Sequence, residues 1–276
     1  MVVVVTQEEL RAARRRLIEP VGLVPTMGSL HDGHLSLVKY AINECASVVV
    51  SIFVNPTQFG PQEDLGKYPR NLSRDLTLLE SGKVNLVWTP TEEVMYPPGY
   101  QTWVSVEEIA KPLEGSMRPG HFRGVATVVA KLYNVIQPQK AYFGQKDAQQ
   151  AAVIRQMSRD LNFPIEIVVC PTLREPDGLA MSSRNVYLSP NERQASVAIS
   201  QALFKAKEAF QAGVRDVNHL MKVVSETIGA EPLIKVQYIS CAHPDTLQEL
   251  EGTVEQGLLS VAVYIGNTRL IDNIVL

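Results

Sequence analysis

Two histidines three residues apart, His31 and His34, are the side chains in this sequence best placed to bind an anion. They lie in the segment 24–34, VPTMGSLHDGH, where Gly28 and Gly33 leave room for a ligand to approach the backbone. Imidazoles at positions i and i+3 fall on one side of a first helical turn, and the backbone N–H groups there attract anions. The pattern predicts a site for a nucleotide phosphate, with the two imidazoles as further donors.

Two other interpretations of this histidine pair stay open. A histidine near a helix start is often a cap or a surface residue, and a His-x-x-His pair can bind a metal. Zinc normally takes three or four protein ligands, whereas this sequence has neither a cysteine cluster nor a His-Glu-x-x-His motif. We therefore favour phosphate binding.

Strands and helices alternate along the first 172 residues. Apolar runs predict buried strands at 21–24, 48–54, 85–88, 141–143 and 165–169, and helical patterns are centred on 7–18, 33–45, 71–81, 123–136 and 147–160. This alternation predicts an α/β fold: a Rossmann-like parallel sheet with helices on both faces. Ligands bind such sheets beyond the carboxyl ends of the strands. Because His31, Asn55, Gln58 and Lys146 all follow predicted strands, we expect one pocket to gather them.

The sequence predicts a second, smaller α+β domain at 173–276, after a first domain at 1–172. Residues 174–185 contain a proline, a glycine and two serines and are predicted to connect the domains. A capping box at 189–192 opens a long helix, and a second helix covers about 216–228. Strand-like runs follow at 234–239, 259–265 and 269–274.

Composition excludes several classes of protein. The 276 residues are 45% hydrophobic and 20% charged with a net charge of −3, so the basic footprint of a nucleic-acid-binding protein is missing. Cys45, Cys170 and Cys241 lie far apart, which excludes a disulfide framework and suits a reducing cytosol. Residues 1–5 predict a short strand rather than a signal peptide, and no apolar run approaches the roughly 20 residues that span a bilayer.

Four segments together resemble one family. The run PTMGSLHDGH at 25–34 is similar to the HxGH signature of the nucleotidyltransferase superfamily. The segments FVNPTQFG at 53–60, YFGQKDAQQ at 142–150 and DGLAMSSRN at 177–185 resemble the pantoate–β-alanine ligase family within it, in order and in spacing. The resemblance covers essentially the whole chain.

The resemblance implies an ATP-dependent ligase that makes pantothenate from (R)-pantoate and β-alanine. The first half-reaction forms pantoyl adenylate and pyrophosphate, and the second releases AMP. Mg²⁺ would bind mainly through the ATP phosphates, with Asp75 as a weak candidate ligand. The family also implies a homodimer in the cytoplasm, with no nucleic-acid or membrane partner. Domain 1–172 would bind nucleotide and pantoate, and domain 173–276 would carry the Ser-Ser-Arg loop.

Site residues follow from matching positions. The catalytic candidates are His31, His34 and Lys146, of which Lys146 would meet the α-phosphoryl oxygens as a point charge. Asp147 can accept ribose hydroxyls, and the loop at 182–184 would close over the β- and γ-phosphates. The complete set expected to bind ATP is Met27, Gly28, His31, His34, Gly144, Lys146, Asp147, Leu173, Met181, Ser182, Ser183 and Arg184, with Leu173 and Met181 flanking the adenine.

The acid and amine substrates have fewer candidate residues. Gln58 and Gln150 carry neutral amides that suit the hydroxyls and carboxylate of pantoate, and Asn55 is a weaker candidate. Arg118, His121 and Arg123 are weaker candidates for the substrate sites, and no one of them is assigned to the β-alanine carboxylate. The polar loop at 60–68 would shield the reactive anhydride from water.

Three rival functions stay open. An HxGH adenylyltransferase would leave AMP on its product, and the blocks at 53–60 and 142–150 argue against it. A class I synthetase-like RNA binder conflicts with the net charge of −3. A nucleotide-sensing module would not need His31, His34, Lys146 and the loop at 182–184 together.

Overall fold

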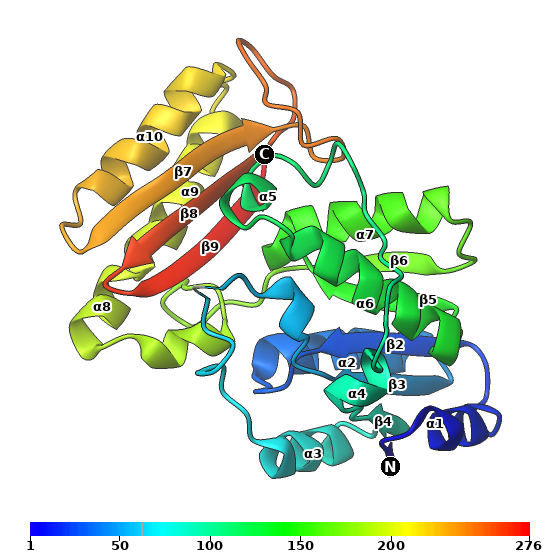
Figure 1. Cartoon of the computed structure of the whole chain (residues 1–276). Coiled ribbons are helices and arrows are strands. Elements are labelled where there is room, and N and C mark those ends of the chain that lie inside the picture. The colour runs from blue at the N-terminus through cyan, green and yellow to red at the C-terminus, as the bar shows by residue number, and fades with distance from the viewer. Residues whose placement is uncertain (62) are drawn as a thin grey trace. The chain divides into compact units, whose positions relative to one another are not determined.

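The computed structural model describes residues 1–61 and 63–276, which form two compact units (Figure 1). One unit comprises Met1–Gly144 and Gln149–Pro171, and the other comprises Gln145–Ala148 and Thr172–Leu276. The short segment 145–148 therefore groups with the second unit, whereas we expected it in the first. Gln62, in the loop predicted to shield the anhydride, lies outside the described residues.

The first unit contains a six-stranded sheet whose paired strands all run parallel, in the order β1-β4-β3-β2-β5-β6. The strands are β1 (Val2–Val4), β2 (Val21–Thr26), β3 (Ser47–Ile52), β4 (Leu86–Trp88), β5 (Lys140–Gly144) and β6 (Glu166–Cys170). This confirms the predicted Rossmann-like sheet. The strand order reverses between β2 and β5, and such a switch point is where parallel α/β sheets bind ligands. The segments that contain His31 and Lys146 leave these two strands.

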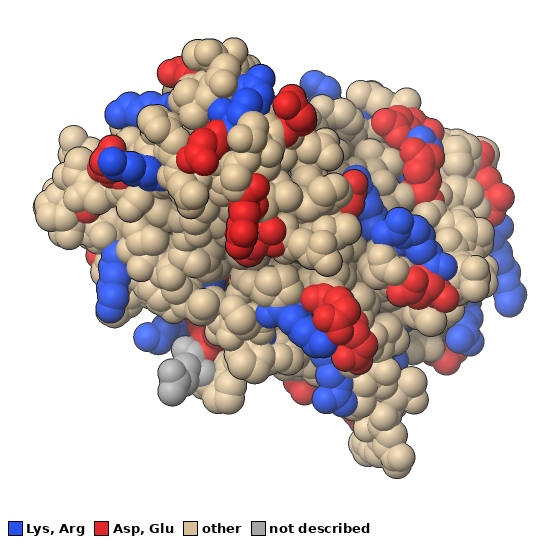
Figure 2. Space-filling model, turned by 90° about the horizontal axis from the view of Figure 1, so that it is seen from above, with Lys and Arg blue, Asp and Glu red and all other residues tan. Residues whose placement is uncertain are grey.

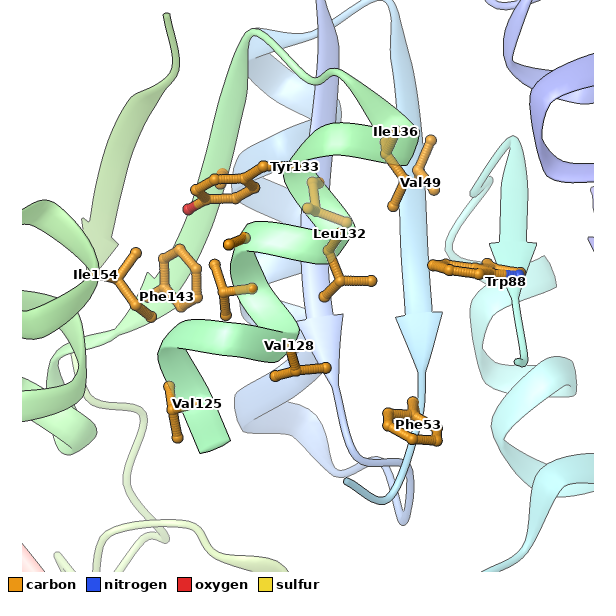
Figure 3. Close-up of a cluster of buried hydrophobic side chains, with 14 of the residues drawn as sticks. Val49, Phe53, Trp88, Val125, Val128, Leu132, Tyr133, Ile136, Phe143 and Ile154 are labelled. Carbon is orange, nitrogen blue, oxygen red and sulfur yellow. The ribbon is translucent and has the colours of Figure 1, made fainter. Parts of the chain in front are cut away.

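Alternate residues of the central strands face opposite hydrophobic layers. Leu23 and Val49 pack in one cluster with α1 (Gln7–Arg14), α6 (His121–Ile136) and α7 (Ala148–Asp160). In Figure 3 the α6 side chains Val128 and Leu132 point toward strand β3. Val24 and Val50 face the other way, against α2 (Asp32–Glu44) and α3 (Leu72–Ser81). Helices therefore cover both faces, as predicted.

The second unit has an antiparallel sheet of β7 (Ile234–Ala242), β8 (Leu258–Ile265) and β9 (Thr268–Val275), in that order. It packs with α9 (Val197–Gln211) and α10 (Val217–Gly229) around one apolar cluster. The predicted capping box forms between Ser189 and Glu192, but it opens only the short helix α8 (Pro190–Ala195). The expected single long helix is wrong because the chain turns at Ser196. There the Ile199 N–H donates to the Ser196 carbonyl three residues earlier, which interrupts the regular four-residue spacing between α8 and α9.

Shorter helical segments complete the described secondary structure. They are the helices α4 (Glu92–Met95) and α5 (Glu114–Met117) and the 3₁₀ turns η1 (Pro56–Gln58), η2 (Gln145–Asp147) and η3 (Ser183–Tyr187). All three cysteines are buried and none forms a disulfide. No helix in the described ranges is long and apolar enough to cross a membrane. On the face in Figure 2, basic and acidic side chains are intermixed, which matches the near-neutral charge balance.

Candidate functional site

The histidine segment begins with a sharp turn after β2. Gly28 has φ +81°, and a Cβ there would lie 3.1 Å from both Asp75 Oδ2 and Ile52 Cγ2. Ser29 is also left-handed, with φ +51°. Glycine tolerates this conformation and this close approach, which explains the residue at position 28.

Asp75, on α3, holds the next two backbone groups. It is buried, and its two carboxylate oxygens accept hydrogen bonds of 2.8 Å from the N–H groups of Ser29 and Leu30. The neighbouring Arg74 donates to the Leu30 carbonyl at 2.9 Å. These bonds account for a buried carboxylate at this position, so the structure gives Asp75 a positioning role that the sequence did not predict.

The two imidazoles lie together at the start of α2, with ring centroids 4.1 Å apart. His31 is the N-cap, and its Nδ1 accepts from the Gly33 N–H at 3.1 Å. Nδ1 of His34 accepts from the His31 N–H at 3.4 Å. An accepting Nδ1 places the proton of a neutral ring on Nε2, so each ring can present an Nε2–H donor. The two imidazoles therefore lie side by side at the first turn of α2, as expected, and His31 also caps that helix.

Asn55 and Gln58 lie together around η1 and are joined by a hydrogen bond. Asn55 Nδ2 donates to Gln58 Oε1 at 3.0 Å and to the Gly124 carbonyl at 3.2 Å. Its Oδ1 accepts from the hydroxyls of Tyr96 and Thr57, both at 2.9 Å. Every polar atom of the Asn55 amide is therefore used within the protein. These bonds hold the Asn55 side chain against η1 and α6, and its contact with pantoate stays a prediction.

Gln58 keeps donor capacity for a substrate. Its Nε2 donates to the Met27 sulfur at 3.2 Å, and a thioether is a weak acceptor that a substrate oxygen can replace. Gly124 on α6 allows η1 to approach closely, because a Cβ there would lie 2.4 Å from the Thr57 carbonyl oxygen.

The three weaker candidates Arg118, His121 and Arg123 all have partners within the first unit. Arg118 forms two hydrogen bonds with the carboxylate of Glu63, at 2.6 and 2.7 Å. His121 Nδ1 donates to the Gln58 carbonyl at 2.8 Å, and its Nε2 lies 3.1 Å from Arg118 Nη1. Burial, and then the charge of Arg118, lower the pKa of His121 to about 4. Arg123 stacks over Trp103, 4.5 Å from the ring centroid.

Adjacent glutamines on α7 differ in their surroundings. Gln149 is buried, accepts from the Glu114 N–H at 2.9 Å and donates to the carbonyls of Ile109 and Pro112. It ties the 109–114 segment to α7. The predicted substrate residue Gln150 is half-buried.

Lys146 and Asp147 form part of η2, which belongs to the second unit. Lys146 Nζ lies 3.7 Å from Asp147 Oδ1, a loose pair that leaves the ammonium available to an anion. Asn273, on β9, donates through Nδ2 to the carbonyls of Gln145 and Lys146, at 3.0 and 2.8 Å. A Cβ at the preceding Gly144 would meet nothing within 4 Å.

The Ser182–Arg184 segment is the start of a 3₁₀ turn. Ser182 caps it by accepting from the Arg184 N–H at 3.3 Å. Ser183 is buried and begins η3. Met181 donates its N–H to the Leu173 carbonyl at 3.0 Å, so the two residues expected to flank adenine are neighbours.

Sequence reasoning missed the residues that contact the candidate segments from elsewhere in the chain, namely Gly124, Tyr96, Gln149 and Asn273. Nothing in their local sequence marks them, because each acts on a segment distant in the chain. For metals, the described residues contain no group of three or more His, Cys, Asp or Glu that could hold an ion.

A doubly wound sheet with paired imidazoles at a helix start is an architecture of nucleotide-binding α/β enzymes. The family model of pantoate–β-alanine ligase matches residues 2–275. Pantothenate synthetases from Roseiflexus castenholzii and Herpetosiphon aurantiacus are 58% and 57% identical to this chain, covering all of it and 99% and 100% of those proteins. The chain belongs to the pantoate–β-alanine ligase family.

Solved structures agree with this assignment. Pantothenate synthetase from Thermus thermophilus is 49% identical, with a TM-score of 0.95 over 99% of both chains. The ligase from Francisella tularensis, solved with β-γ ATP and β-alanine, is 37% identical, with a TM-score of 0.82 over 99% of this chain and 97% of that one. The chain is an ATP-dependent ligase that forms pantothenate from pantoate and β-alanine.

Proposed function

We propose that His31, His34 and Lys146 stabilise the charge that develops when pantoate attacks ATP. A carboxylate oxygen of pantoate bonds to the α-phosphorus, and the bond from that phosphorus to the bridging oxygen breaks. Pyrophosphate leaves with the electron pair, and pantoyl adenylate remains. Charge grows on the phosphoryl oxygens during this step, and preorganised donors lower its barrier.

The paired imidazoles carry this proposal. Because both Nδ1 atoms accept backbone N–H bonds, the neutral rings have Nε2–H groups with which to donate to phosphate. The ring separation of 4.1 Å lets them serve neighbouring phosphate oxygens. Lys146 supplies a full positive charge to the α-phosphoryl group.

The remaining ATP contacts divide by chemistry. Ser182, Ser183 and Arg184 donate to the β- and γ-phosphates, and Asp147 accepts from the ribose hydroxyls. Leu173 and Met181 flank the adenine, while Met27, Gly28 and Gly144 bind through close backbone approach. Mg²⁺ would be held mainly by phosphate oxygens and would supply further charge neutralisation.

Gln58 and Gln150 bind pantoate through their amides, and Asn55 orients Gln58. In the second step the amine of β-alanine attacks the acyl carbon of the adenylate, AMP leaves with the electron pair of the broken bond, and the amine nitrogen loses a proton. Holding the amine beside a reactive anhydride supplies much of the acceleration. The loop at 60–68 limits hydrolysis of the anhydride by water.

Pantoate-dependent exchange of labelled pyrophosphate into ATP tests this scheme. We expect exchange without β-alanine, and AMP with pantothenate only after β-alanine is added. Exchange that strictly requires β-alanine would refute a free adenylate, and an adenylylated final product would identify the alternative adenylyltransferase. Light scattering of the purified protein tests the further expectation of a homodimer, and fractionation of its native cell tests a cytoplasmic location.

A further inference from the structure

The turn that contains Lys146 is held by a side chain from the far end of the sequence. Asn273 Nδ2 donates to two successive carbonyls, those of Gln145 and Lys146, at 3.0 and 2.8 Å. In turn, Gln145 Nε2 donates a hydrogen bond to Asn273 Oδ1 at 3.1 Å. Asn273 is buried, so these three bonds have little competition from water. Only an amide offers two donors and an acceptor in this arrangement.

Asn273 is itself held by its neighbour on β9. The Asp272 carboxylate accepts from the Asn273 N–H at 2.8 Å and from both Nη atoms of Arg174, at 2.6 and 3.0 Å. Asp272 is buried, and a bidentate pair with arginine fixes a carboxylate in orientation. Arg174 also donates to the Gly178 carbonyl at 3.1 Å. The same ion pair therefore anchors the loop that leads to Ser182.

We propose that Asn273 is a positioning residue for Lys146, and that the Asp272–Arg174 ion pair, which also holds Asn273, positions the loop at 182–184. The inference rests on the proposed role of Lys146. A lysine side chain has four flexible methylene groups, so its ammonium reaches the α-phosphoryl group reproducibly only if its backbone is fixed. Two bonds to consecutive carbonyls fix that backbone without engaging the ammonium.

The test is pyrophosphate exchange with four proteins: wild type, Lys146→Ala, Asn273→Asp and the double variant. Asn273→Asp places a carboxylate oxygen against the two carbonyls. We expect it to lower the kcat of exchange about 10- to 100-fold while the KM for pantoate changes less than about 3-fold, because the lost bonds orient a transition-state donor. In the Lys146→Ala background, Asn273→Asp should lower the kcat of exchange less than about 3-fold, because the effects of two residues that act through one another are not additive.

Gln237→Glu is the matched control. It makes the same amide-to-carboxylate change on the same sheet, beside Arg269 at 2.8 Å, and should leave exchange unchanged. If Asn273→Asp does not fold, Asn273→Ala removes the donors without adding charge and enters the same cycle. Multiplicative losses in the double variant, or exchange above one third of wild type in the single variant, would overturn the inference. Wild-type exchange by Lys146→Ala would instead refute the proposed role of Lys146, and this inference with it.

Discussion

The carboxylate of Asp75 accepts a 2.8 Å hydrogen bond from the backbone N–H of Ser29, which lies 46 residues earlier in the chain. Its other oxygen accepts from the next N–H, that of Leu30. One buried side chain on α3 thus fixes the left-handed turn that leads into His31. The backbone that leads to the histidines proposed to bind phosphate is therefore held by a long-range contact as well as by the local motif.

Asp75→Asn should impair both stability and catalysis. An amide replaces one acceptor with a donor, so one buried N–H of the turn loses its partner and faces another N–H. We expect the free energy of unfolding to fall by about 2–3 kcal/mol and the kcat of exchange to fall about 10-fold. Urea unfolding and exchange kinetics measure the two effects. Asp216→Asn, the same change at the exposed N-cap of α10, should leave exchange intact. Equal exchange rates in the two variants would show that the Asp75 hydrogen bonds do not hold the histidine turn for catalysis.

Gln58→Ala should separate pantoate binding from ATP binding. Loss of a hydrogen bond to a charged or hydroxyl group is worth about 1.5–3 kcal/mol, so the KM for pantoate should rise roughly 10- to 100-fold. The ATP dissociation constant should barely change because no phosphate contact is lost. Steady-state kinetics and ATP titration measure both halves, and the exposed Gln201→Ala on α9 serves as control. Weakened ATP binding with an unchanged KM for pantoate would show that Gln58 contacts ATP rather than pantoate.

Gly124→Ala should displace Gln58 without touching its side chain. The new Cβ would lie 2.4 Å from the Thr57 carbonyl oxygen and 2.7 Å from the Gln58 nitrogen, so η1 or α6 must move. Overpacking of this kind costs about 1–3 kcal/mol, and we expect the KM for pantoate to rise in the same direction as for Gln58→Ala. Gly229→Ala on α10, where a Cβ meets nothing within 4 Å, should be neutral. Unchanged pantoate kinetics in Gly124→Ala would argue against this packing.

His121 should make the protein sensitive to mild acid. Its folded-state pKa is about 4, lowered first by burial and then by Arg118, against an ordinary value of about 6.5. Between about pH 6.5 and pH 4, His121 is therefore protonated in the unfolded chain but neutral in the folded chain. The stabilisation is complete above about pH 6.5 and is lost as pH falls toward 4. Between pH 7 and pH 5 this group alone should remove about 2 kcal/mol.

Urea unfolding at pH 7 and pH 5 measures this loss. The His121→Asn variant retains a side-chain donor for the Gln58 carbonyl but does not titrate in this range, so it should lose about 2 kcal/mol less than wild type. His219→Asn, at an exposed position on α10, is the control and should track wild type. Equal losses in wild type and His121→Asn would show that His121 is not the titrating group.

Local patterns in the sequence were enough to predict the fold class. Apolar runs of strand length alternate with helical periodicity, and that pattern is set by each segment alone, so the parallel sheet and its two helical faces were confirmed. The motif at 25–34 likewise predicted a helix start with paired imidazoles. The expected single long helix after residue 189 was wrong because the helix is interrupted at Ser196, and apolar periodicity does not show where one helix ends and the next begins.

The sequence by itself determined which residues we propose for this reaction: His31, His34, Lys146 and Gln58. Only the tertiary structure decided what holds them. Asp75 accepts hydrogen bonds from the turn before His31, the Asn55 amide donates to Gln58, and the Asn273 amide donates to the Lys146 carbonyl. Each of these supports joins segments far apart in the chain. Composition and periodicity report on neighbours along the chain, whereas a hydrogen bond in the folded state depends on neighbours in space.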